Sequence, residues 1–255
     1  MFKFLICFIA GIGAGLGTGF AGMSAAAVIS PMLITFLGLP AYEAVGIALA
    51  SDVLASAVSA YTYGKNKNLD IRGGVVMMAA VLIFTLVDSF VASLVPNTTM
   101  GNFSMFMTLL LGIKFIVKPV MTTKESMAAV SARKRFVQSA VSGTIVGFIC
   151  GFVGAGGGMM MLLLLTSVLG YELKTAVGTS VFIMAFTALT GAASHFAIGG
   201  MPDLWCLVFC VASTLLWARI AAKFANKASA VTLNRATGVV LTVLGIAILS
   251  VNYLR

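Results

Sequence analysis

The chain has 255 residues, of which 60% are hydrophobic and only 9% are charged, and its mean hydropathy is +1.10. In soluble domains about a quarter of all residues are charged, so this composition excludes a soluble globular protein and predicts an integral membrane protein. The formal net charge of +9 would suit nucleic acid in a soluble protein. Here Lys and Arg stand in short loops, and no basic stretch alternates with aromatic residues, so we expect no nucleic-acid partner.

Apolar segments that approach the ~20 residues needed to cross a bilayer recur along the whole chain. Their continuous hydrophobicity, without strand-like alternation, predicts helices that satisfy their own backbone in lipid. The predicted segments are Phe4–Gly22, Ser24–Gly38, Ala41–Tyr63, Gly73–Val95, Phe103–Val117, Phe136–Gly154, Gly157–Gly170, Leu173–Ile198, Leu204–Trp217 and Ala236–Leu254. The polar loops predicted between them include Lys65–Asn68, Pro96–Asn102, Thr122–Arg135 and Lys223–Arg235.

An internal repeat is the most informative feature of the sequence. With an offset of 132 residues, Gly11, Gly15, Gly19, Phe20 and Gly22 coincide with Gly143, Gly147, Gly151, Phe152 and Gly154. The same offset aligns Leu37–Gly38 with Leu169–Gly170 and Ala44–Gly46 with Ala176–Gly178. We therefore expect one membrane domain made of two repeats, residues 1–130 and 131–255.

The basic residues predict how the two halves are oriented. If each half opens with a helical hairpin followed by three spans, an outside N-terminus places nearly all Lys and Arg inside, as the positive-inside rule requires. Reading each hairpin as one interrupted span gives parallel repeats, and it leaves Arg219, Lys223, Lys227 and Arg235 outside. We prefer the first arrangement: an all-α polytopic bundle of two inverted-topology repeats in a bacterial inner (cell) membrane. The oligomeric state stays open, with a homodimer as one option.

Each opening hairpin contains a glycine break. Consecutive glycines cost roughly 1 kcal/mol each inside a helix, but they allow positive φ and expose backbone N–H groups. A helix that starts at such a break points its N–H groups and positive dipole end at an anion. Close helix packing is the alternative reading, and for the Gly11–Gly19 run it is the better one. The predicted substrate-binding residues are Gly22, Met23, Ser24, Gly154, Ala155, Gly156, Gly157 and Gly158.

The second break also carries a family resemblance. The stretch from Gly147 to Gly158, followed by Leu169–Gly170 and Ala176–Ser180, resembles the TauE/SafE family of membrane transporters. The resemblance covers essentially the whole chain, although the first half has Met23–Ala27 where a glycine cluster is usual. It implies transport, with export suggested, of sulfite, sulfonates or other small organosulfur anions. Thr179 and Ser180 could then hold the oxygens of such an anion, or bond a neighbouring helix backbone instead.

Two acids stand deep in apolar sequence, Asp52 and Asp88. A charged carboxylate there costs at least ~3 kcal/mol on insertion scales, so we expect it to face a cavity or a partner. We predict that Asp52, with Ser51 as co-ligand, binds a coupling proton or sodium ion. Asp88 is expected to pair with Lys114 or Arg219. His195, the single histidine, is read as a packing residue.

The function predicted from these features is an ion-coupled secondary transporter for a small anionic substrate, and the resemblance suggests the direction of export. Two alternatives remain, an intramembrane enzyme and a passive channel for small anions. The enzyme is disfavoured because no serine lies in a Gly-x-Ser-x-Gly motif and neither Asp lies in a glycine-flanked motif. We expect no cofactor and no metal site, and we read Cys7, Cys150, Cys206 and Cys210 as small core residues.

Overall fold

The computed structural model describes residues 2–92, 109–110, 112–128, 130–153, 157–199 and 201–253. Within them every regular element is a helix, which confirms the all-α prediction. The predicted Pro96–Asn102 loop and positions 154 to 156 of the second break lie outside these residues. The helices are α1 (Phe2–Ala21), α2 (Ala26–Leu37), α3 (Ala41–Lys65), α4 (Ile71–Ala92), α6 (Lys124–Ala128), α7 (Ala132–Val153), α8 (Gly157–Ser167), α9 (Leu173–Gly199), α10 (Leu204–Lys227) and α11 (Ala230–Tyr253).

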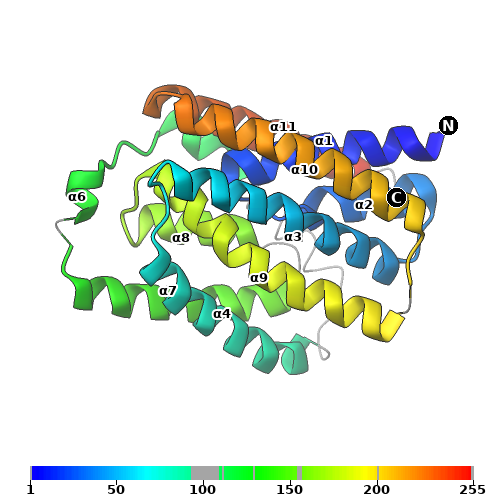
Figure 1. Cartoon of the computed structure of the whole chain (residues 1–255), viewed down its shortest axis with the longest axis horizontal. Coiled ribbons are helices and arrows are strands. Elements are labelled where there is room, and N and C mark those ends of the chain that lie inside the picture. The colour runs from blue at the N-terminus through cyan, green and yellow to red at the C-terminus, as the bar shows by residue number, and fades with distance from the viewer. Residues whose placement is uncertain are drawn as a thin grey trace.

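The long helices lie side by side along the long axis of the molecule (Figure 1). The N-terminal end of α1 and the start of α10 lie at one end of this bundle, and α6 lies at the other. Five of the described helices are long and apolar enough to cross a membrane, by length and composition: Phe2–Ala21, Ala41–Lys65, Leu173–Ala197, Leu204–Lys227 and Ala230–Ala247. The chain is therefore an integral membrane protein.

Helix ends recur at the offset found in the sequence. α1 ends at Ala21 and α7 at Val153, while α3 begins at Ala41 and α9 at Leu173, and each pair is 132 residues apart. Gly38 and Gly170, also 132 apart, both have a φ of 65°. This left-handed conformation favours glycine, and it directly ends α2 at Gly38, whereas Gly170 turns the chain three residues after α8 ends at Ser167.

The two halves interlock instead of forming separate bodies. α1 of the first half packs on α10 of the second, and α7 of the second packs on α4 of the first. The equivalent helices α3 and α9 pack on each other. They run antiparallel, since Gly46 near the start of α3 faces His195 and Gly178 near the start of α9 faces Tyr63. An inverted repeat requires this relation; the inverted topology in a membrane and the boundary at residue 130 stay predictions.

The basic loop predicted at Lys223–Arg235 is wrong in its extent. α10 continues to Lys227, and α11 begins at Ala230, so only two residues separate them. Ala and Lys are strong helix formers, and the alanines in this part of α10 pack against α1, where Ala221 faces Gly19. The prediction from hydropathy ended this helix too early, because hydropathy does not take the packing of α10 on α1 into account.

The α1–α10 contact depends on glycines, and it predicts the effect of enlarging one of them. A Cβ at Gly15 would lie 2.7 Å from the Thr214 carbonyl oxygen and 2.8 Å from the Ala218 nitrogen. We expect Gly15→Ala to push the helices apart and destabilise the protein by about 1–3 kcal/mol. Thermal unfolding in detergent measures this. Gly64→Ala is the matched control, because its Cβ would meet only the end of the Leu69 side chain at 3.4 Å.

The position of α6 predicts the sidedness of the chain. α6 lies at the opposite end from the start of α1 (Figure 1), and Lys124 in α6 bonds the Lys67 carbonyl oxygen, so the basic segments meet there. We expect this end to face the cytoplasm. In a cysteine-free protein, Ser131→Cys should react with an impermeant thiol reagent in inside-out vesicles and not in intact cells. Strong labelling in intact cells would contradict the predicted orientation.

Candidate functional site

The first break and the start of α8 meet inside the bundle. A Cβ placed on Gly158 would lie 2.7 Å from the Gly22 carbonyl oxygen and 2.9 Å from the Ser24 nitrogen. Ser180 of α9 reaches the same place, because its Oγ donates to the Gly22 carbonyl oxygen at 3.1 Å. The structure therefore brings together Gly22, Ser24, Gly158 and Ser180, which the sequence placed in two separate halves.

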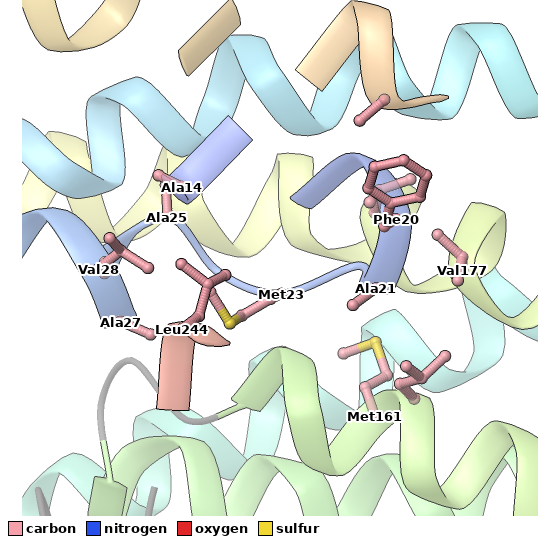
Figure 2. Packing of buried hydrophobic residues seen from close by; sticks show 14 of the residues in the cluster. Ala14, Phe20, Ala21, Met23, Ala25, Ala27, Val28, Met161, Val177 and Leu244 are labelled. Atoms are coloured by element: carbon pink, nitrogen blue, oxygen red, sulfur yellow. The ribbon is translucent and has the colours of Figure 1, made fainter. Parts of the chain in front are cut away.

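The break after α1 is a tight helix end. Gly22 has a φ of 60°, its N–H donates to the Thr18 carbonyl at 3.0 Å, and the Met23 N–H donates to the Gly17 carbonyl at 3.2 Å. The Gly22 bond, from a residue with positive φ to the carbonyl four residues before it, is the bond that ends a helix in the αL motif. The Met23 side chain is fully buried and lies over Gly17, close to Leu244 in Figure 2. Its side chain is thus packed in the core, and its backbone N–H already has a partner.

The carbonyl groups of this helix end are bonded by hydroxyl groups from several helices. The donors are Tyr63 to Gly19 (2.8 Å), Thr237 to Phe20 (3.2 Å), Ser180 to Gly22 (3.1 Å) and Thr18 to Met23 (2.9 Å). They come from α3, α11, α9 and α1. The break is therefore held by hydroxyl groups of α3, α9 and α11, together with one from α1 itself.

Asp52 of α3 reaches the start of α2. Its Oδ2 accepts a hydrogen bond from Ser24 Oγ at 2.7 Å, and its Oδ1 accepts one from Ser56 Oγ at 2.8 Å. The backbone amide of Ala25 also interacts with this carboxylate, and Asp52 is only 1% exposed. The carboxylate thus occupies the positive end of α2, a place that favours negative charge.

Ser56, and not the predicted Ser51, bonds Asp52 in the structure. The Ser51 hydroxyl donates to the Ile47 carbonyl in its own helix at 2.8 Å, so it does not bond Asp52 in this conformation. Ser56 does, and sequence analysis missed it. The signal was present, because residues four apart share a helix face. A coupling role for Ser51 stays a prediction.

The second half differs at the position that repeats Asp52. An offset of 132 places Met184 there, and its Sδ would lie 2.7 Å from a Cβ on Gly158. A neutral thioether thus stands beside the start of α8, where the first half has a carboxylate. Thr179 lies elsewhere: its Oγ1 accepts from the Asp70 backbone N–H at 3.2 Å.

The other polar residues singled out in the sequence lie away from this centre. His195 Nδ1 is 3.1 Å from the Tyr42 carbonyl oxygen and its ring stacks on that of Tyr42, beside a cavity of about 160 Å³. Lys114 donates to Ser167 Oγ, Arg219 is exposed, and the Asp88 side chain lies outside the described part. Among the described residues, no group of His, Cys, Asp or Glu is placed to hold a metal ion.

Comparisons with known proteins give a consistent result. Residues 7–248 match the family described as Sulfite exporter TauE/SafE. The probable membrane transporter protein YdhB of Bacillus subtilis is 21% identical, over 92% of this chain and 96% of that protein. YunE of the same organism, also described as a probable membrane transporter, is 23% identical over 80% of this chain and 82% of that protein. A probable membrane transporter protein of Methanocaldococcus jannaschii is 26% identical, over 75% of this chain and 70% of that protein.

The contact between the two breaks predicts the effect of a methyl group at Gly158. In Gly158→Ala the new carbon would clash with backbone atoms of the first break. Overpacking of this kind costs about 1–3 kcal/mol, so we expect transport to fall roughly tenfold or more while the protein still inserts. Uptake per inserted molecule in vesicles measures this, with Gly64→Ala as control. Unchanged transport would contradict a functional role for the contact.

Proposed function

The chain belongs to the TauE/SafE family and is a membrane transporter, and we propose that its cargo is a small organosulfur anion such as sulfite, thiosulfate or a sulfonate. The observation that carries this proposal is the meeting of two helix starts beside one buried carboxylate. Helix N-termini attract anions, and in a membrane such ends mark the substrate sites of transporters with interrupted helices. The expected direction is export, as the family description indicates.

The start of α8 is the end where we place the anion. Donors at the first break are already used, because Gly22 and Met23 bond α1 and the Ala26 N–H is 3.3 Å from Ser24 Oγ. At the second break the neighbour is Met184, which carries no charge to repel an anion. Gly157 and Gly158 allow a ligand to approach the backbone closely, and the Ser180 hydroxyl can turn from Gly22 toward it.

Asp52 is the proposed coupling residue, because its charge competes with the substrate. An ionised Asp52 holds the Ser24 hydroxyl at the start of α2 and repels a second anion nearby. A protonated Asp52 no longer repels it and needs fewer donors, so that Ser24 and the α2 backbone can face the substrate. Anion and proton would then bind together, and their relative gradients would set the direction of net flux.

The arrangement of donors around Asp52 favours a proton over sodium. Its described partners, Ser24, Ser56 and the Ala25 amide, all donate hydrogen bonds. A sodium ion needs oxygen acceptors around it, and the nearby carbonyls of Gly22 and Met23 already accept bonds from Ser180 and Thr18. In export, the outward substrate gradient would have to exceed any opposing proton gradient.

Flux into proteoliposomes tests the proposal. A panel of sulfite, thiosulfate, sulfoacetate, taurine and non-sulfur acids identifies the substrate class. We expect wild-type protein to accumulate the substrate against its gradient when a proton gradient is imposed. Asp52→Asn keeps the shape but cannot titrate, so accumulation should vanish while exchange of labelled substrate continues.

Controls separate this result from general damage. Thr62→Val, also on α3, removes a hydroxyl that bonds only its own helix in the structure, and it should retain accumulation. Undiminished proton-driven accumulation by Asp52→Asn would exclude Asp52 as the coupling residue. Accumulation that follows a sodium gradient would exclude the proton, and flux without any gradient coupling would indicate a passive channel.

A further inference from the structure

An acidic residue at the start of α10 connects three helices. Asp203 Oδ1 accepts a hydrogen bond from the Cys206 N–H at 3.0 Å, which caps α10. Its Oδ2 pairs with the Lys3 ammonium of α1, and its backbone N–H donates to Glu43 Oε1 of α3 at 2.7 Å. The Lys3 ammonium holds the pKa of Asp203 below its usual range. We call these residues, Asp203, Lys3 and Glu43, the Asp203 cluster.

The same arrangement exists at the other end of the bundle, before α4. Asp70 Oδ1 accepts from the Gly73 N–H at 3.1 Å, and Oδ2 lies 3.9 Å from Arg135 Nη1 of α7. The Asp70 backbone N–H donates to Thr179 Oγ1 of α9 at 3.2 Å. These residues, Asp70, Arg135 and Thr179, are the Asp70 cluster. Tyr171 also donates to Asp70 Oδ2 at 2.6 Å; burial raises the pKa of Tyr171, so it stays protonated.

The ion pairs of the two clusters correspond in the internal repeat, with a shift of one residue at the aspartate. Lys3 and Arg135 are 132 residues apart, and Asp70 and Asp203 are 133 apart. In both clusters the aspartate caps its own helix with Oδ1, pairs with a cation of the opposite half through Oδ2, and donates its N–H to the central α3–α9 pair. Independent surface ion pairs would not reproduce these three bonds in the same order.

Each cluster closes one end of the seam between α3 and α9, and the two ends differ in tightness. Beside the Asp203 cluster, Glu43, Gly46 and His195 line the 160 Å³ cavity. Beside the Asp70 cluster the backbones touch, since a Cβ on Gly178 would lie 2.0 Å from the Asn68 carbonyl oxygen. The Asp203 and Lys3 side chains are 28% and 38% exposed, against 15% and 25% for Asp70 and Arg135.

We propose that the two clusters are the gates of the transporter, one at each end, and that each must break to admit substrate from its own side to the start of α8. This inference rests on the proposed transport function. Both ion pairs join one half to the other through α1–α10 and α7–α4. A relative movement of the halves that pulls one pair apart leaves the other engaged, as alternating access in repeat-based transporters requires.

The test measures access to the centre from each side, with no substrate present. The reporter is Ala48→Cys in a protein otherwise free of cysteine. Ala48 is fully buried on α3, one turn before Asp52. Asn caps a helix as well as Asp does, so Asp203→Asn and Asp70→Asn remove the ion pairs and keep the caps. The rate of labelling by an impermeant maleimide is measured in intact cells and in inside-out vesicles.

We expect the two variants to change access in opposite directions. Asp203→Asn should raise the labelling rate from the side that the Asp203 cluster faces by about two- to fivefold, the range that one exposed ion pair supplies. It should lower the rate from the opposite side. Asp70→Asn should do the reverse. Lys3→Gln and Arg135→Gln break the same pairs from the other partner and should reproduce the two patterns. Glu125→Gln is the control, because Glu125 is an exposed acid in α6 outside both clusters.

The outcomes separate the two proposals. If both Asp variants shift access in the same direction, or neither shifts it, the clusters are structural caps and the gate assignment is overturned. Because labelling needs no cargo, this can happen while organosulfur transport stands. If the two variants shift access in opposite directions but the protein transports no organosulfur anion, the gate proposal is supported and the proposed cargo is wrong. Size-exclusion profiles identify any variant that does not fold. In that case the variant of the ion-pair partner, Lys3→Gln or Arg135→Gln, is used to test the same cluster.

Discussion

A helix that stops inside an apolar bundle leaves carbonyl and amide groups without water to bind, and each unsatisfied group costs several kcal/mol there. The break after α1 is organised by this constraint. Tyr63, Thr237, Ser180 and Thr18 bond its carbonyls, and Asp52 and Ser24 meet the start of α2. These groups come from both halves. Satisfying one short stretch of backbone therefore fixes where α3, α9 and α11 sit against α1.

The two breaks differ in the charge of the side chain beside them. The first carries its own anion, Asp52, bonded by two serines, and the second carries Met184 at the repeated position. An acid at both of the repeated positions would place two negative charges beside the meeting helix starts and disfavour an anionic cargo there. With one acid and one thioether, the centre has a single titratable charge in the described residues. In the proposed mechanism, one proton on Asp52 would switch the centre between repelling and admitting an anion.

Helix type, the repeat and the positions of the breaks could be predicted from the sequence, because they depend on local hydropathy and on glycine spacing. The partners of Asp52 and the two ion-pair clusters could not. Ser24 is 28 residues from Asp52, and Lys3 is 200 residues from Asp203, so these contacts appear only once the helices have docked. Met23 shows the same limit: its place in a predicted anion site gave no sign that the left-handed turn at Gly22 would direct its side chain into the core.

The interlocking of the halves has a consequence for biogenesis. α1 packs on α10 and α4 on α7, so the first half is synthesised before either of these partners exists. During that interval the glycine face of α1 lies in lipid without α10, which covers it in the finished bundle. Domains generally fold in the order of their synthesis, but here the first repeat cannot complete its own core. The nascent chain must remain inserted and unfinished, held by lipid or by the insertion machinery, until the second repeat arrives.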